Sequence, residues 1–180
     1  SKWLCPLLKK SATKEGESRI VTVASRAHYY GKIDIDDLNS KHGYSGMRVY
    51  GRSKMANIRH TRALANELAD SGITVNCLHP GVIKSNFAKG QGGLTGWGFK
   101  LFSWGMLSTA EGADTALYLA LSPEVKGKTG GYYYRRRLGK LSRHARDLSL
   151  DPLLYQVSDK MITRACDCGF GVAGQRNGSA

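Results

Sequence analysis

The sequence is poor in cysteine and has no long apolar run, and each shortage excludes a class of protein. Its four cysteines do not form the framework of a disulfide-rich domain, and the close pair Cys166 and Cys168 cannot fill a four-ligand zinc site. The five histidines are scattered, so we expect no metal site. No stretch approaches the roughly eighteen apolar residues of a membrane span, and residues 1–10 lack a secretory signal. We therefore expect reduced thiols and an intracellular protein, cytoplasmic or peripheral to a membrane.

Acidic residues are also scarce. The chain has 14 Asp and Glu against 27 Lys and Arg, a formal net charge of +13. Such an excess can serve nucleic-acid binding, because basic clusters release counterions from phosphates. The basic residues are spread along the chain, however, with residues 135–137 as the only tight run and no nucleic-acid motif around them. We expect no nucleic-acid partner but a basic face that favours an anionic cofactor or an acidic membrane surface.

The order of the apolar segments predicts one α/β domain. With 41% hydrophobic residues, a chain of 180 residues can bury one core but is too short for two ordinary domains. Residues 19–25 alternate β-branched side chains and predict a buried strand that ends on Ser25. Residues 44–70 predict a helix that stops before Gly72, and residues 73–78 predict a second strand. Strand, helix and strand in this order predict a parallel sheet.

The second half of the chain predicts further elements. Residues 108–121 predict a helix with Ser108 or Thr109 as its N-cap and Glu111 as the reciprocal partner in a capping box. Residues 130–134 predict a strand, and residues 152–164 predict an amphipathic helix.

Glycine and aromatic residues dominate two other segments. Residues 90–105 mix glycines with apolar and aromatic side chains, which favours a substrate-pocket wall over a segment that dips into a membrane interface. We place the folded domain in residues 1–164 and expect a disordered Gly-rich tail in residues 165–180.

A possible proton-transfer pair lies on the long predicted helix. Tyr50 and Lys54 are four residues apart, so a helix places both side chains on one face. An adjacent ammonium favours the phenolate of a tyrosine, which brings it closer to the working range of an acid/base catalyst. Ser25, at the end of the neighbouring strand, could hold a substrate oxygen beside Tyr50. The spacing alone is common and usually arises by chance; its context between two strands, before a His-Pro-Gly turn at residues 79–81, favours the catalytic interpretation.

These motifs together resemble the C-terminal part of the short-chain dehydrogenase/reductase family, in its retinol-dehydrogenase and WW-domain-oxidoreductase-like branch. The resemblance runs from about Trp3 to Thr163, and the long interval between Ser25 and Tyr50 is typical of the branch. Its motifs are Pro6-Leu7-Leu8-Lys9-Lys10, the segments 19–28 and 50–57, and His79-Pro80-Gly81.

The resemblance implies a fold and a site. The fold would be α/β: the C-terminal half of a Rossmann-type doubly wound parallel sheet that lacks its N-terminal βαβ units. Tyr50 would be the acid/base, Lys54 would tune it and bind the nicotinamide ribose, and Ser25 would position the reacting oxygen. The turn with Pro80, Gly81, Ile83 and Ser85 would flank the nicotinamide.

The resemblance also implies an activity and its partners. The parent protein would be an NAD(P)-dependent oxidoreductase that interconverts an alcohol and a carbonyl on a small, apolar substrate. NADP is slightly favoured over NAD as the cofactor. Family members often pair through the helix that bears Tyr50, so a homodimer is an open alternative.

Departures from the family pattern keep a second hypothesis open. The family's Gly-rich phosphate turn, its cofactor-selecting residue and the asparagine of its proton relay are expected upstream of Ser1. Arg59-His60 stands where the branch usually has apolar residues, and residues 132–137 also differ from its usual pattern. The alternative is a truncated, non-catalytic fragment or pseudo-enzyme that acts only as a binding protein.

Overall fold

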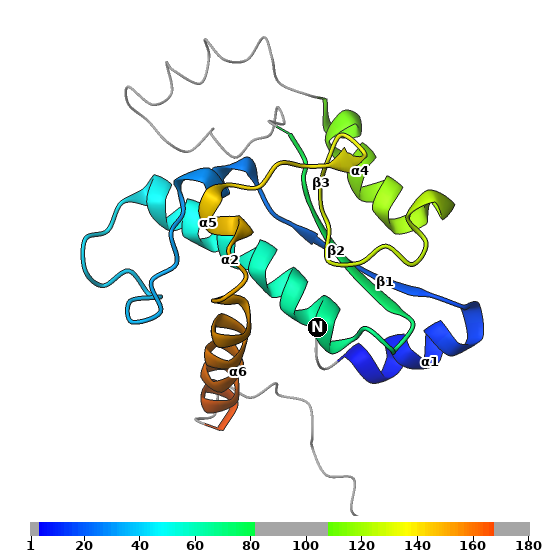
Figure 1. The fold of residues 1–180 in the computed structure, drawn as a ribbon, viewed down its shortest axis with the longest axis horizontal. Coiled ribbons are helices and arrows are strands. Elements are labelled where there is room, and N and C mark those ends of the chain that lie inside the picture. The colour runs from blue at the N-terminus through cyan, green and yellow to red at the C-terminus, as the bar shows by residue number, and fades with distance from the viewer. Residues whose placement is uncertain (1–3, 82–107, 168–180) are drawn as a thin grey trace, which may run out of the picture.

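A four-stranded sheet in the order β1-β2-β3-β4 lies at the centre of the structure, a computed structural model that describes residues 4–81 and 108–167 (Figure 1). The elements, in chain order, are α1 (Cys5–Glu15), β1 (Ser18–Val23), the 3₁₀ helix η2 (Arg26–Tyr30), α2 (Gly46–Glu67), β2 (Ile73–His79), α4 (Thr109–Leu121), the 3₁₀ turn η5 (Pro123–Val125), β3 (Tyr132–Tyr134), β4 (Arg137–Leu138), α5 (Arg143–Arg146) and α6 (Asp151–Asp167). The predicted α/β class and its main strands and helices are thus confirmed.

The first three strands run parallel, which brings their carboxyl ends to one edge of the sheet. β1 pairs with β2 from Ser18↔Ile73 to Val23↔Leu78, and β2 pairs with β3 up to His79↔Tyr134. The short β4 turns back antiparallel to β3. Every residue of β2 is buried, whereas β1 is mostly half-buried, because it pairs on one side only within the described residues. The carboxyl edge is where open parallel sheets bind ligands.

Helix α2 is the main connection between β1 and β2, and its buried residues form a stripe with helical spacing. It begins after Ser45, whose extended backbone stops the helix from reaching back to residue 44 as predicted. It ends at Glu67, earlier than predicted, because residues 68–72 form turns that close at Gly72, which has a left-handed φ of 69°. The stripe comprises Gly51, Met55, Ile58, Arg59, Thr61, Leu64 and Ala65.

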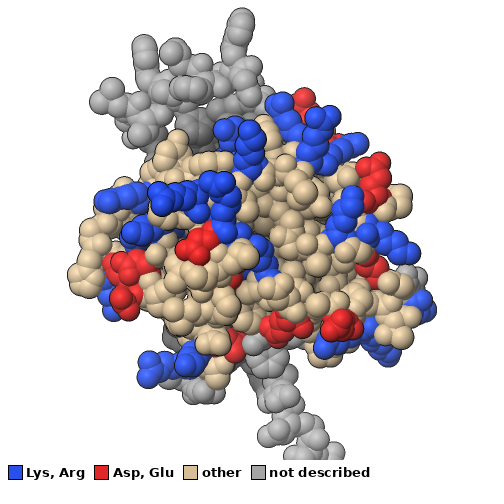
Figure 2. Space-filling model, in the orientation of Figure 1, with Lys and Arg blue, Asp and Glu red and all other residues tan. Residues whose placement is uncertain are grey.

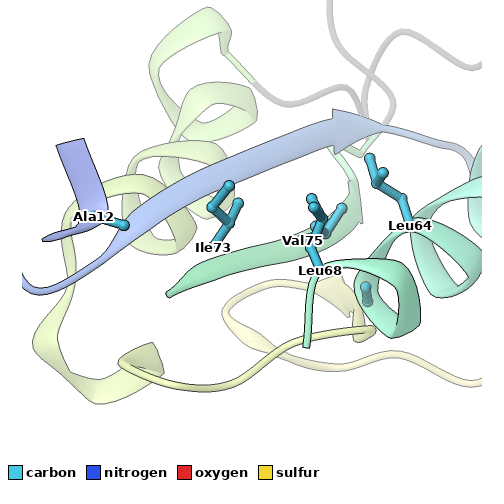
Figure 3. Close-up of a cluster of buried hydrophobic side chains, with 6 residues drawn as sticks. Ala12, Leu64, Leu68, Ile73 and Val75 are labelled. Carbon is cyan, nitrogen blue, oxygen red and sulfur yellow. The ribbon is translucent and has the colours of Figure 1, made fainter. Parts of the chain in front are cut away.

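Helices cover both faces of the sheet, as a doubly wound fold requires. On one face, α1 and α2 meet β2, where the buried side chains of Ala12, Leu64, Leu68, Ile73 and Val75 pack together (Figure 3). On the other face, α4 packs Leu119 against Leu78 and Tyr133. Side chains alternate along a strand, so the odd-numbered residues of β2 face α2, and the even-numbered Leu78 faces α4.

The C-terminal elements follow the sequence prediction with shifted ends. α4 has the predicted capping box, with Ser108 as the N-cap: its hydroxyl accepts from the Glu111 N–H, and its own N–H donates to the Glu111 carboxylate at 2.7 Å. β3 begins only at Tyr132, because Gly130 takes a left-handed φ of 74°. α6 continues beyond Arg164 to Asp167; residues 168–180 of the predicted tail, like residues 90–105, lie outside the described part.

A buried cluster of charges holds α6 against α2 and accounts for the unusual Arg59. The guanidinium of Arg59 is 2% exposed and donates to Asp151 Oδ1 at 2.6 Å. Two further donations reach the backbone carbonyls of His144 and Asp147, both within 2.7 Å. Arg62 binds the other carboxylate oxygen of Asp151 at 2.7 Å. A charged residue therefore fits this buried position, because Asp151 of α6, His144 of α5 and Asp147 after α5 supply acceptors.

The neighbouring His60 also contacts α6. Its ring stacks on Tyr155 with 5.3 Å between centroids. Among residues 4–81 and 108–167, no helix is long and apolar enough to cross a membrane.

We predict that Asp151→Asn destabilises the fold strongly. The variant keeps the side-chain volume but leaves Arg59 and Arg62 without their shared anion, and breaking a buried ion pair in this way costs about 3–5 kcal/mol. Urea unfolding followed by circular dichroism measures the loss. Asp70→Asn, at an exposed position after α2, is the control and should change the free energy of unfolding by less than about 0.5 kcal/mol. Equal effects of the two substitutions would contradict the assigned role of the cluster.

Candidate active site

Three segments that carry predicted site residues meet at the carboxyl edge of the sheet. Ser25 follows β1, Pro80 and Gly81 follow β2, and Tyr50 and Lys54 lie on α2. The β1–β2 register puts the ends of the two strands next to each other. Ile83 and Ser85, the other predicted cofactor contacts, lie outside the described residues.

Lys54 links helix α2 to the end of β1. Its ammonium Nζ donates to the carbonyl oxygen of Val23 at 3.4 Å and lies 5.6 Å from the centroid of the Tyr50 ring. A cation at this distance is attracted to the ring face. Tyr50 itself is 43% exposed, so its hydroxyl is accessible to a ligand. The predicted pairing of Tyr50 and Lys54 on one helix face is present.

Ser25 is held by its own backbone turn. It is the N-cap of η2, and its Oγ accepts a hydrogen bond from the Ala27 N–H at 3.1 Å. A serine hydroxyl that accepts one bond keeps its proton for donation. Ser25 can therefore donate to a substrate oxygen while its position remains fixed by the turn.

Two glycines allow the Ser25 turn to lie directly on helix α2. A Cβ on Gly51, the residue after Tyr50, would lie 2.7 Å from the Ala27 carbonyl oxygen and 2.8 Å from the Gly31 nitrogen. A Cβ on Gly31 would lie 2.3 Å from the Gly51 carbonyl oxygen. Only glycine at both positions permits this backbone-to-backbone approach. It brings the turn that begins with Ser25 against the part of α2 that carries Tyr50.

The turn after β2 begins with Pro80 and Gly81 at the carboxyl edge of the sheet. Gly81 has a φ of 91°, which favours glycine, and follows the half-buried Pro80. His79, just before it, is buried and stacks on Tyr134 with 5.1 Å between ring centroids. Burial, with a smaller contribution from Arg26, lowers the pKa of His79 to about 4, so this ring is neutral at physiological pH. An uncharged ring pair, His79 and Tyr134, thus lies at the carboxyl ends of β2 and β3.

Other nucleophilic and metal-binding side chains in residues 4–81 and 108–167 form no second site. Burial raises the pKa of the Cys77 thiol to about 12, so it is an unreactive core residue. Within the described ranges, no three His, Cys, Asp or Glu side chains are grouped to hold a metal ion.

Comparisons with known proteins agree with this geometry. The profile of a family described as enoyl-(acyl carrier protein) reductase matches residues 10–134, well over half of the chain. The chain belongs to the short-chain dehydrogenase/reductase family. Human retinol dehydrogenase 14 is 42% identical over 162 residues, which cover 88% of this chain and 47% of the relative. The chain lies in the retinol-dehydrogenase-like branch, as the sequence predicted.

Other relatives also match most of this chain and about half of their own length. Human polyprenol dehydrogenase is 34% identical, with 88% of this chain and 49% of the relative covered. The short-chain dehydrogenase TIC 32 B, chloroplastic, of Brassica napus is 36% identical, with 86% and 50% covered. A crystal structure of an uncharacterised protein from Mycobacterium paratuberculosis has a TM-score of 0.61 at 27% identity, with 82% and 51% covered. The chain thus spans about half the length of the curated relatives it matches.

Three residues of this short-chain dehydrogenase/reductase site were not predicted from sequence. Asn57, one helical turn beyond Lys54, donates to the same Val23 carbonyl at 3.1 Å. Gly51 makes the close approach described above, and its presence inside a helix, where glycine is unfavourable, was the available signal. His28 bonds to the Ser25 backbone, and only its separation of three residues from Ser25 could have indicated this contact.

We predict that Gly51→Ala destabilises the fold by about 1–3 kcal/mol, because the new methyl group would overlap backbone atoms of the Ser25 turn. Gly46→Ala is the matched control on the same helix: there the nearest atom to a Cβ is 4.0 Å away, and replacing glycine by alanine should be neutral or stabilise by up to about 1 kcal/mol. Thermal unfolding of both variants measures the difference, and a stabilising Gly51→Ala would refute the close approach.

Proposed function

We propose that this chain is the catalytic half of an NAD(P)-dependent oxidoreductase that interconverts an alcohol and a carbonyl group. The observation that carries the proposal is the pair Tyr50 and Lys54 on α2, held against the Ser25 turn at the carboxyl edge of a parallel sheet. Membership of the short-chain dehydrogenase/reductase family supports it. Because the chain spans about half of its relatives, the activity is assigned to the longer protein of which it would be part.

Each residue has a distinct role in the proposed reaction. Tyr50 gives a proton to the substrate oxygen during reduction and removes it during oxidation. Lys54 supplies positive charge beside the phenol, and its anchor on the Val23 carbonyl fixes where that charge lies. Ser25 donates a hydrogen bond to the same substrate oxygen. The nicotinamide cofactor, when bound, supplies the hydride-transfer chemistry that these groups serve.

The residues proposed to hold the nicotinamide half are Tyr50, Lys54, Pro80, Gly81, Ile83 and Ser85. The fit rests on the accessible phenol of Tyr50, the ammonium next to it and the glycine-dependent turn at Gly81. NADP is slightly favoured over NAD by the family resemblance. The adenosine half would bind to a preceding βαβ unit whose last strand pairs with the open edge of β1.

The proposed substrate is a small, apolar alcohol or carbonyl compound. Relatives at 42% and 34% identity are named for retinol and polyprenol, both apolar alcohols. We also propose that the protein forms a homodimer through α2 and contacts a membrane surface. It would be cytoplasmic or peripheral to a membrane. In Figure 2, Lys and Arg lie in separate groups with Asp and Glu between them, so the visible face is no single basic patch.

We predict that Tyr50→Phe lowers kcat at least about 100-fold in the longer protein, because it removes the acid/base hydroxyl and keeps the ring. Nicotinamide absorbance, followed with a panel of aldehydes and ketones, measures turnover. Tyr44→Phe, at a 75% exposed tyrosine just before α2, is the control and should retain wild-type rates. Equal turnover by the wild type and Tyr50→Phe would refute the role of Tyr50.

A non-catalytic binding protein is the second candidate, favoured for the chain of 180 residues by the edge of β1 that pairs with no strand among residues 4–81 and 108–167. We predict that this chain binds NADPH and NADH more weakly than the micromolar range, on the order of 1 mM or worse, because residues 4–81 and 108–167 contain no Gly-rich turn from a strand into a helix that could bind the phosphates. Isothermal titration measures the affinity, with the longer protein as the positive control. Micromolar binding by the 180-residue chain would show that its own residues suffice for a complete cofactor site.

A further inference from the structure

His28 is the most completely buried titratable residue near the site, and the proposed reaction does not use it. Its side chain is 0% exposed. Nδ1 lies 2.8 Å from the Ser25 carbonyl oxygen, and Nε2 lies 3.2 Å from the backbone nitrogen of Ser142. The ring packs on Tyr29 and meets the edge of Tyr132 at 5.2 Å between centroids. Both ring nitrogens therefore have partners from different parts of the chain.

The two hydrogen bonds fix the tautomer of His28. A backbone N–H can only donate, so Nε2 must accept from Ser142 and carries no proton. The single proton of the neutral ring is then on Nδ1, which donates to the Ser25 carbonyl. Burial is the main cause that lowers the pKa of His28, and Arg26 acts in the same direction, whereas the bond to Ser25 opposes it. The ring is thus neutral, with one donor and one acceptor, and both are used.

The hydrogen bond from His28 Nδ1 restrains Ser25, the residue proposed to donate its hydroxyl proton to the substrate oxygen. The Ser25 carbonyl accepts from both the ring and the backbone N–H of His28, while Ser25 Oγ accepts from Ala27. Ser25 is consequently held at its carbonyl and at its side chain in one extended conformation, with φ −161° and ψ 156°. Its backbone could otherwise rotate at the junction between β1 and η2.

We propose that His28 is a positioning residue for Ser25: its neutral Nδ1–H locks the Ser25 carbonyl, and its Nε2 ties that lock to the Ser142 backbone. The proposal rests on the proposed function, in which Ser25 donates to the substrate oxygen. Ser142 is the N-cap of α5, and the carbonyls of His144 in α5 and of Asp147 directly after it accept from Arg59. The catalytic serine is thereby connected through His28 to the C-terminal segment, and through Arg59 back to helix α2.

Replacing His28 by asparagine or by glutamine distinguishes its hydrogen bond to Ser25 from its hydrogen bond to Ser142. The side-chain amide of asparagine ends at the same distance from Cα as Nδ1, so His28→Asn can still donate to the Ser25 carbonyl. The amide of glutamine reaches as far as Nε2, so His28→Gln can still accept from Ser142 but loses the bond to Ser25. His42→Gln is the control, because that ring is 89% exposed in the loop before α2.

Nuclear magnetic resonance of the 180-residue chain tests the lock without any need for activity. In the wild type, long-range ¹H–¹⁵N spectra should show His28 as the Nδ1–H tautomer, and the two Hα–Hβ couplings of Ser25 should indicate a single rotamer. The couplings should stay distinct in His28→Asn and His42→Gln and become averaged in His28→Gln. An Nε2–H tautomer, or averaged couplings in the wild type, would overturn the proposal even if no variant folds.

A double-mutant cycle in the longer protein tests whether the lock acts through the serine. We expect His28→Gln to lower kcat by about 100-fold with little change in KM, because a displaced hydroxyl mainly weakens the transition state. In a Ser25→Ala background the same substitution should cost almost nothing further. Equal losses in both backgrounds would show a purely structural role and overturn the proposal. An inactive wild type would refute the proposed function, and the spectra would still decide the contact between His28 and Ser25.

Discussion

The contact between the backbones of Gly31 and Gly51 is the constraint on which the site depends. Side chains elsewhere keep helices and turns apart by the width of a methyl group or more, but here the Ser25 turn lies directly on α2. Gly51 follows Tyr50 immediately, so the approach takes place beside the proposed acid/base residue. Lys54 and Asn57, one and two turns further along α2, both reach the end of β1 through the Val23 carbonyl. β1, the Ser25 turn and α2 are therefore held together by the backbone contact at Gly31 and Gly51 and by two side-chain donors on the Val23 carbonyl.

The C-terminal segment stabilises this arrangement from outside. Its acidic residue Asp151 neutralises Arg59 and Arg62 on α2, and the backbone carbonyls of His144 and Asp147 accept two further hydrogen bonds from the Arg59 guanidinium. Buried charges of this kind fix the relative position of two helices more strictly than apolar contacts do, because each donor must meet its acceptor. The departure at Arg59 is thus compensated by partners more than eighty residues away in the chain.

β2 is more deeply buried than β1. This difference fits a chain that spans about half the length of its relatives. β2 is buried throughout because it has a strand on each side and helices on both faces. β1 has helices on both faces but a strand on one side only in the described part, and its last residue, Val23, is 49% exposed. An edge strand with a free row of backbone groups can accept a further strand. Such a strand would complete the doubly wound sheet and place the other half of a dinucleotide site beside Ser25 and Tyr50.

The sequence by itself determined the main strands and helices and the pairing of Tyr50 with Lys54, but not the short elements η2, β4 and α5. Alternating β-branched residues, an uninterrupted helical pattern and the capping box at Ser108 are local signals, so the strands, helices and their order could be read from them. Element ends were less certain: Ser45 and Gly130 stop α2 and β3 through backbone conformations that short-range patterns do not reveal. Only the tertiary structure decided the role of Gly51, the partners of Arg59 and the position of His28 between Ser25 and Ser142. Each of these depends on residues far apart in the chain, whose meeting is set by packing and by hydrogen-bond geometry rather than by spacing.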